Sequence, residues 1–190
     1  ANAKLPRYRS IESIPYFERE HYQSNPLFLN VYTPPIYADL KIDLIDITQT
    51  KLYIWMTEII CLSDPYKIRW MKSYFKLKIF RPWQKIMKML ILFSEQRGVG
   101  KTSFMAVMQA CLSIDRCIEV HKLKDIFREQ NSATYGKLII FLDDMPILNK
   151  KESETMKAKV TETSYLLKKL YLDPTKEISY HDFIFTSNHM

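Results

Sequence analysis

Residues 95–102 read Glu95-Gln96-Arg97-Gly98-Val99-Gly100-Lys101-Thr102, and this stretch decides the fold of the chain. It holds two of only three glycines among 190 residues, where average usage of about 7% would give roughly a dozen. An apolar run up to Phe93 precedes the stretch, and a helical pattern from Ser103 follows it. Strand, glycine-containing loop and helix in this order are the context of a phosphate-binding loop. We therefore predict that this loop binds the phosphates of a nucleotide.

The residue types of the loop suit a triphosphate and its metal ion. The backbone amides of the loop and of the following helix face the anion, Lys101 adds a positive charge, and the Thr102 hydroxyl reaches a magnesium ion. The predicted nucleotide-binding residues are Gln96, Arg97, Gly98, Val99, Gly100, Lys101, Thr102 and Ser103. Glu95 stands where the usual pattern G-x-x-x-x-G-K-S/T has its first glycine, so the match is imperfect. The alternative is a helix that merely begins with Gly-Lys-Thr.

Polar residues end two further apolar stretches. Residues 138–142 form an apolar run that ends in Asp143 and Asp144, and residues 183–185 form another that ends in the small polar residues Thr186, Ser187 and Asn188. Such runs are typical of buried parallel strands, whose carboxyl ends bind the ligands of open α/β sheets. We therefore expect the two aspartates and Asn188 to lie beside the loop. The alternatives are an ordinary polar strand end for the aspartates and a turn residue for Asn188.

The placement of these side chains predicts a division of roles for phosphoryl transfer, which needs positioning and charge neutralisation. Asp143 completes the shell of the magnesium ion together with Thr102, directly or through a water molecule. Asp144 orients the attacking water as a general base, and Asn188 hydrogen-bonds that water or the γ-phosphate. The predicted catalytic residues are thus Lys101, Asp144 and Asn188, and the predicted metal ligands are Thr102 and Asp143.

These three motifs, in this order, resemble those of the superfamily-3 helicases, the AAA+-type motors of small viruses, phages and plasmids. The likeness is to the primase-helicase branch and its virulence-associated-E relatives, whose A, B and C motifs are similar to residues 95–102, 138–144 and 183–188. It covers about residues 28–190. The resemblance implies an α/β fold of the P-loop AAA+ type, a parallel sheet flanked by helices, with a small helical lead-in before the sheet and a β-hairpin before the last strand.

The resemblance also implies a function. Such motors use ATP and Mg²⁺ to translocate on single-stranded DNA, with RNA less expected, as a homo-oligomeric, hexameric ring in the cytoplasm of the host cell. In the family, the hairpin between the B and C motifs projects into the central channel and holds the nucleic acid. Here that role falls on lysines of the hairpin segment: Lys168, Lys169 and Lys176.

The chain departs from the family pattern at its end. It stops two residues after Asn188, whereas the family places its arginine finger and last core strand after the C motif. We therefore expect a fragment with an extended N-terminal segment (1–47), a helical lead-in (48–84) and a truncated ATPase core (85–190). Two other functions stay open: a P-loop kinase, which would need a lid with arginines, and a nucleotide-independent nucleic-acid-binding or scaffold module with a vestigial loop.

The net charge of +7 is concentrated just before the loop. Residues 64–90 hold eight basic side chains against one acid, Asp64, with aromatic residues between them. Such a patch binds nucleic-acid backbones, but it is also typical of the solvated face of a helix whose aromatics are core. Asp64-Pro65 predicts an N-cap and a first helical residue, so we expect this basic helix to run to about Lys78.

Other segments predict further elements. Residues 51–62 are apolar nearly all round, which indicates a buried helix that starts near Thr48 or Thr50. Asn149 and Glu152 indicate a capped helix up to about Thr161, and 166–172 with 177–180 indicate a hairpin that turns at 173–176. The three cysteines and four histidines have no metal-site spacing along the chain, and no apolar run is long enough to cross a bilayer.

Overall fold

The computed structural model describes residues 10–12, 28–30, 46–96, 98–127, 131–146, 148–169 and 171–188, the first two ranges as backbone only. In those two ranges, β1 (Ser10–Glu12) and β2 (Phe28–Asn30) pair in parallel. Apart from these two strands, the predicted extended segment (1–47) lies outside the described residues up to residue 45.

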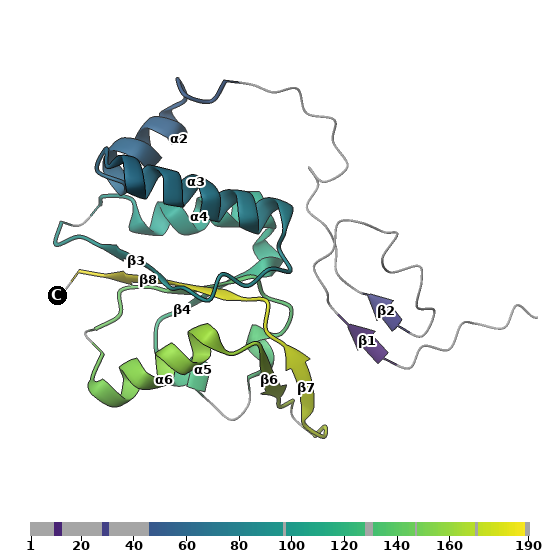
Figure 1. Cartoon of the computed structure of the whole chain (residues 1–190). Helices are drawn as coiled ribbons and strands as arrows, with labels where there is room; N and C mark the ends of the chain where they lie inside the picture. The colour runs from purple at the N-terminus through teal and green to yellow at the C-terminus, as the bar shows by residue number, and fades with distance from the viewer. Residues whose placement is uncertain are drawn as a thin grey trace, which may run out of the picture.

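A four-stranded parallel sheet forms the centre of the fold (Figure 1), and its strand order is β3-β8-β5-β4. The strands are β3 (Leu90–Phe93), β4 (Cys117–Val120), β5 (Ile139–Leu142) and β8 (Asp182–Ser187). β5 and β8 are buried along their whole length, as expected for central strands of a parallel sheet. Because all four strands run the same way, their carboxyl ends meet at one edge.

Helices cover both faces of the sheet, which confirms the predicted α/β layering. α3 (Pro65–Phe80) and α4 (Lys101–Leu112) lie on one face, and α5 (Lys124–Phe127) and α6 (Lys150–Thr161) lie on the other (Figure 1). Alternate residues of each central strand enter different cores: Phe141 and Ile184 pack with the α3–α4 layer, and Ile140 and Phe183 with the α6 layer. Short 3-10 helices, η3 (Ile114–Arg116) and η4 (Ser132–Thr134), precede β4 and β5.

The predicted helix starts are confirmed in detail. The Asp64 carboxylate accepts from the amides of Tyr66 (2.8 Å) and Lys67 (3.3 Å), and Pro65 is the first helical residue. Asn149 and Glu152 form a reciprocal capping box with distances of 2.9 and 3.0 Å. These caps satisfy amides that have no partner within the helix, which is why the sequence signals are dependable.

The helix expected at 51–62 is not buried all round, so that prediction is wrong in part. The segment forms α2 (Lys51–Ile54), capped by Thr50, and continues as a π-helix, η2 (Trp55–Ile60). Leu52 and Ile59 are 53% and 50% exposed. The segment packs on the α3–α4 layer from outside, so only the side of it that carries Trp55 enters the core.

The hairpin exists, but its arms lie nearer the N-terminus than predicted: β6 (Ser164–Leu167) pairs antiparallel with β7 (Thr175–Ile178). The predicted turn at 173–176 is therefore wrong in extent, since the connection spans 168–174. The physical reason is Asn131, whose side chain donates to the Leu166 carbonyl (2.8 Å) and accepts from the Lys168 amide (2.9 Å). These bonds fix the end of β6.

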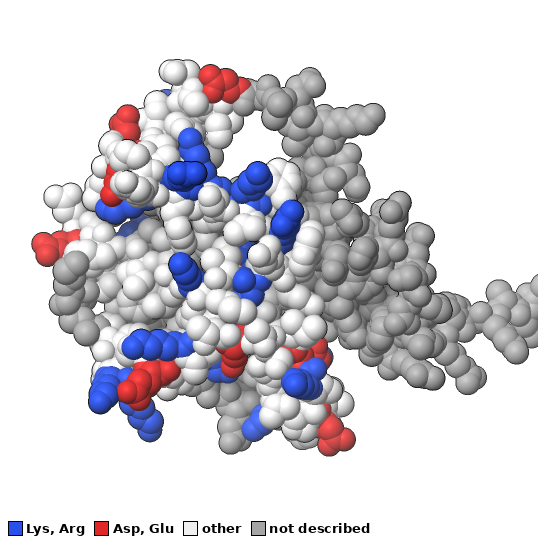
Figure 2. Space-filling model, in the orientation of Figure 1, with Lys and Arg blue, Asp and Glu red and all other residues white. Residues whose placement is uncertain are grey.

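Of the lysines of the basic segment, one is fully buried and another is half-buried. Lys78 is fully buried in an ion pair with Asp182, and the Lys85 ammonium donates to the Lys159 and Glu162 carbonyls and to Ser179 Oγ. The exposed members are Lys67, Arg69, Lys72, Lys76, Arg81 and Lys88. Figure 2 shows basic side chains gathered over the helical lead-in, while basic and acidic side chains are mixed around α6 and the hairpin. The basic surface is real but smaller than the sequence count suggests.

Cys61 and Cys117 are buried and Cys111 is half-buried, and none of the three forms a disulfide. Among the described residues, no helix combines the length and the apolar character that crossing a bilayer requires.

Candidate functional site

The carboxyl edge of the sheet holds a pocket of about 450 Å³. It lies between the loop that begins α4 and the ends of β5 and β8. Its lining residues are Gly98, Val99, Gly100, Lys101, Thr102, Ser103, Asp143, Asp144, Thr186 and Asn188. The structure therefore brings together all the residues expected at the site except two. Gln96 does not line the pocket and bonds through its backbone to the Ser94 hydroxyl, and Arg97 lies outside the described residues.

Left-handed backbone explains the two loop glycines. Gly98 has φ of +77° and Gly100, the N-cap of α4, has φ of +96°, a region that costs an L-residue about 1–2 kcal/mol. Gly100 has a second constraint, because a Cβ there would lie 2.6 Å from the indole nitrogen of Trp55. A Cβ at Gly98 would meet nothing within 4 Å among the described residues. The loop is thus packed directly against η2 of the lead-in.

This difference predicts unequal costs for two matched substitutions. Gly98→Ala should lower the free energy of unfolding by about 1–2 kcal/mol, from backbone strain alone. Gly100→Ala should cost at least 1 kcal/mol more, because the packed Trp55 ring must also move. Urea denaturation of the two variants measures both costs. Equal costs would contradict the Trp55 contact.

Lys101 bridges the loop and the last strand. Its ammonium donates to the Ser94 carbonyl (2.9 Å) and to Asn188 Oδ1 (2.5 Å). Ser94 follows β3 and Asn188 follows β8, so one side chain ties together the carboxyl ends of two adjacent strands. The cation lies where the loop, Asp144 and Asn188 converge.

Thr186 orders the two carboxylates. Its hydroxyl donates to Asp143 Oδ1 (2.7 Å) and accepts from the Asp144 amide (2.9 Å). Asp144 has φ of +47°, and its Oδ1 accepts from Asn188 Nδ2 (2.5 Å). The two carboxylates are therefore held differently. The buried Thr186 hydroxyl holds that of Asp143, and the Asn188 side chain, which also contacts Lys101, holds that of Asp144.

Thr186 is a site residue that the sequence reasoning missed. It was interpreted only as one of the small polar residues that end a buried strand, yet it is fully buried and lines the pocket. The available signal was a lone hydroxyl in Phe183-Ile184-Phe185-Thr186, because a buried hydroxyl needs a partner. Thr102, a predicted metal ligand, is exposed and lines the same pocket as Asp143.

The hairpin lysines lie at the other end of the sheet. The hairpin immediately precedes β8, so it sits at the amino end of the strand whose carboxyl end carries Asn188 (Figure 1). The Lys169 ammonium lies 4.5 Å from the Tyr135 ring centroid, Lys176 is exposed, and Lys168 is half-buried. The structure therefore separates the residues predicted to contact nucleic acid from the loop by the length of the sheet.

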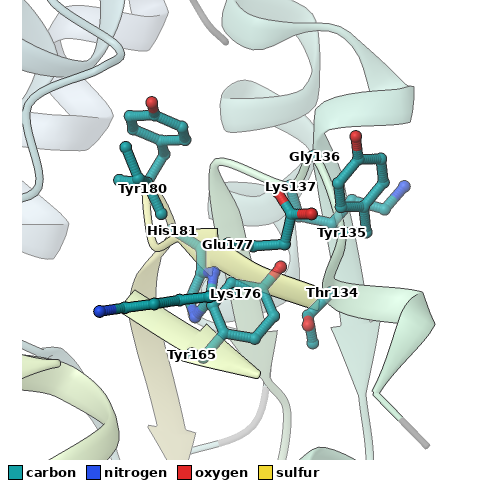
Figure 3. Close-up of a pocket in the computed structure, with 10 residues that line it drawn as sticks. Thr134, Tyr135, Gly136, Lys137, Tyr165, Lys176, Glu177, Tyr180 and His181 are labelled. Atoms are coloured by element: carbon teal, nitrogen blue, oxygen red, sulfur yellow. The ribbon is translucent and has the colours of Figure 1, made fainter. Parts of the chain in front are cut away.

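A second cavity, of about 170 Å³, lies beneath the hairpin. Figure 3 shows that its side chains come from the hairpin (Tyr165, Lys176, Glu177), from the segment before β5 and from Tyr180 and His181 before β8. Burial lowers the pKa of His181 to about 3, and the positive charges of Lys85, Lys159 and Lys78 act in the same direction.

The low pKa of His181 predicts acid sensitivity. A histidine in the unfolded chain has a pKa near 6.5, so it binds a proton below about pH 6.5. In the folded chain His181 stays neutral until the pH falls to about 3. The stability contribution is complete above pH 6.5 and falls by up to about 1.4 kcal/mol per pH unit as the pH drops through this window. Urea denaturation against pH should show a smaller decline for His181→Phe than for the wild type. Parallel declines would contradict the burial of a neutral imidazole.

Residues 92–190 match the profile of a family described as a family of unknown function (DUF5906). No curated protein matches the chain.

Solved structures share the fold. The A form apo structure of the NrS-1 C terminal region superposes with a TM-score of 0.70 at 14% identity, over 98% of this chain and 44% of that one. A further apo structure of that region, residues 305–718, gives a TM-score of 0.68 at 14% identity, over 85% of this chain and 38% of that one. This chain therefore spans less than half of the region it resembles.

Proposed function

This chain belongs to the DUF5906 family, and we propose that it forms the ATP-binding core of a superfamily-3 type helicase with a P-loop AAA+ fold. One observation carries the proposal: the pocket that gathers the loop residues 98–103 also holds Asp143, Asp144 and Asn188. A left-handed glycine at the start of α4 leaves the first amides of that helix facing the pocket, which suits a phosphate. The volume of about 450 Å³ is within the range of ligand pockets.

The donor set of the pocket fits a magnesium ion. Thr102 and Asp143 offer oxygen atoms, which Mg²⁺ prefers, and the hydrogen bond from Thr186 orients the Asp143 carboxylate. Bound there, the ion would supply positive charge to the phosphate oxygens of ATP.

The protein groups perform the remaining steps. Lys101 binds a phosphate oxygen of ATP, which takes the place of Asn188 Oδ1 as the acceptor of its proton. Asp144 takes the proton of the attacking water, and Asn188, released from Lys101, hydrogen-bonds that water or the γ-phosphate. Asn188 directly follows β8, so nucleotide binding changes the hydrogen bonds at the carboxyl end of this strand. The hairpin precedes the amino end of the same strand, so β8 connects the nucleotide pocket to the hairpin.

The partner that we propose is single-stranded DNA, contacted by Lys168, Lys169 and Lys176 in a homo-oligomeric ring. The hairpin supports this proposal because it projects from the sheet (Figure 1). In the sequence it lies between the Asp143–Asp144 pair and Asn188. Aromatic and basic groups occur together there, as in the Lys169–Tyr135 contact.

One observation favours a nucleotide-independent scaffold as the second candidate. The Lys101 ammonium already has two protein acceptors, Ser94 and Asn188, and Glu95 stands at the first glycine position of the loop. A phosphate must therefore compete with existing bonds.

Calorimetric titration with MgATP decides between the two candidates. The wild type should bind ATP at one site, and Lys101→Ala should weaken binding at least tenfold because a charge-assisted hydrogen bond is lost. Lys124→Ala is the matched control: it removes the same charge from an exposed position in α5 that does not line the pocket. Equal ATP affinity for wild type and Lys101→Ala would reject nucleotide binding at this loop.

A further inference from the structure

Three metal-ligating side chains meet beside the pocket, and two of them have no role in the proposed hydrolysis. Glu119 lies in β4, His121 follows that strand, and Asp143 follows β5. One ligand atom from each can be chosen so that all three lie within 4.8 Å of one another. His121 and Glu119 are exposed, and Asp143 is half-buried.

The register between β4 and β5 brings these three residues close together. Glu119 pairs with Phe141 and Val120 with Leu142, so the next step of the parallel ladder sets His121 beside Asp143. The Asp143 amide donates to the Val120 carbonyl (3.2 Å), which continues the ladder beyond the strands themselves. Residues two apart on a strand share a face, so Glu119 and His121 project on the same side. The backbone pairing of β4 and β5 thus fixes the positions from which all three side chains project.

The Asp143 carboxylate is also held in orientation. Thr186, fully buried on β8, donates to its Oδ1 at 2.7 Å. Carboxylates that bind metal ions are commonly oriented by such a hydrogen bond from outside the ligand set. Donors on one zinc ion lie about 2.0–2.2 Å from it, so the three atoms must close up slightly, which the exposed side chains of Glu119 and His121 can do by rotation.

We propose that Glu119, His121 and Asp143 bind a divalent transition-metal ion of the zinc class. One imidazole nitrogen with two carboxylates suits Zn²⁺ or Co²⁺, whereas Mg²⁺ favours oxygen donors alone. Three protein ligands at an exposed position leave room for water or a substrate oxygen as a further ligand. Binding of this ion requires no nucleotide, so the proposal stands apart from ATP hydrolysis.

The site shares Asp143 with the nucleotide pocket. An ion held by His121 and Glu119 would engage the carboxylate that we assign to the magnesium of ATP. The two ions therefore either compete for the Asp143 carboxylate, or this carboxylate bridges them by binding one ion through each oxygen. In both cases a transition metal would affect the nucleotide pocket through one shared side chain.

Titration of the chain with Co²⁺ in the absence of nucleotide tests the site, with the visible absorption of bound Co²⁺ as the signal and Zn²⁺ as the competitor. We expect one Co²⁺ per wild-type chain, displaced by Zn²⁺ but not by millimolar Mg²⁺. His121→Ala and Glu119→Gln should each weaken Co²⁺ binding at least tenfold. Glu154→Gln, an exposed carboxylate on α6, is the matched control and should bind as the wild type does.

Two outcomes would overturn the proposal. Undiminished Co²⁺ affinity in His121→Ala would show that the imidazole is not a ligand. An intense thiolate-to-cobalt absorption band would show that the ion binds at cysteine instead. Lys101→Ala separates this proposal from the one on nucleotide binding, because it should lose ATP affinity and keep Co²⁺ affinity.

Discussion

Asp182→Asn is expected to lower the free energy of unfolding by about 3–5 kcal/mol, the range for breaking a buried ion pair by removal of one partner. Asp182 and Lys78 are both almost completely buried and paired. Burial lowers the pKa of Lys78, while the nearby Asp182 carboxylate opposes that shift. Without the carboxylate, the ammonium keeps only the Gln84 and Tyr180 carbonyls as acceptors among the described residues. The expected cost comes from the buried positive charge that is left uncompensated.

Urea denaturation at neutral pH measures this cost, and two further variants interpret it. Lys78→Met combined with Asp182→Asn removes both charges and should recover much of the loss, since no buried charge is then left without its partner. Lys67→Met is the exposed control, because Lys67 lies 3.9 Å from Asp64 in a pair with more than a third of each side chain in solvent. It should cost less than about 1 kcal/mol. A similar cost for Asp182→Asn and Lys67→Met would contradict a buried charge pair.

The pair has a structural consequence for the site. Lys78 is on α3 and Asp182 begins β8, and the Asp182 carboxylate also accepts from the Ile86 amide at 3.0 Å. The helical lead-in is thereby joined to the amino end of the strand whose carboxyl end carries Thr186 and Asn188. Trp55 joins the same lead-in to Gly100 in the loop. The lead-in thus contacts the loop beside the pocket and the far end of the strand that carries Thr186 and Asn188, although it supplies none of the residues that line the pocket.

Local signals explain what could be predicted from the sequence. Asp64-Pro65 and the Asn149–Glu152 box each involve residues within a few positions of one another, and both caps are confirmed. The apolar run that ends at Asp143 was predicted to be a buried strand, and β5 forms there. The convergence of the loop, Asp143, Asp144 and Asn188 could be predicted because parallel strands place their carboxyl ends at one edge.

Long-range partners explain what could not be predicted. The pair Lys78–Asp182 and the hydrogen bond from Lys85 to Ser179 join residues more than ninety positions apart, so a local charge count assigned both lysines to the surface. Asn131 sets the end of β6 from outside the hairpin. His121 was given no metal role because its spacing was considered along the chain, whereas its neighbour Asp143 comes from the adjacent strand. Each of these depends on contacts between segments far apart in the sequence, which the local sequence pattern leaves open.

The second large effect concerns hydrolysis. Asp144→Asn should reduce the rate of ATP hydrolysis by about 10²–10⁴-fold, the usual contribution of a general base, while MgATP binding stays within a few-fold of the wild type. An asparagine keeps an oxygen that can accept from Asn188 Nδ2, and the backbone amide that donates to Thr186 is unchanged. The hydroxyl of Thr186 also continues to hold Asp143. The substitution therefore removes the base with little change in geometry.

Phosphate release under saturating MgATP measures hydrolysis, and calorimetric titration of each variant measures binding. Together they test whether Asp144 acts as the base and Asp143 as the magnesium ligand. Asp143→Asn serves as the comparison, because it should weaken the dependence of nucleotide binding on Mg²⁺, which Asp144→Asn should leave intact. Glu154→Gln controls for the loss of a carboxylate elsewhere on the surface. If Asp144→Asn hydrolyses ATP at the wild-type rate while Asp143→Asn does not, the base is not Asp144. Asn188 would then be holding a structural carboxylate, and the position of the attacking water would have to be sought on the Asp143 side of the pocket.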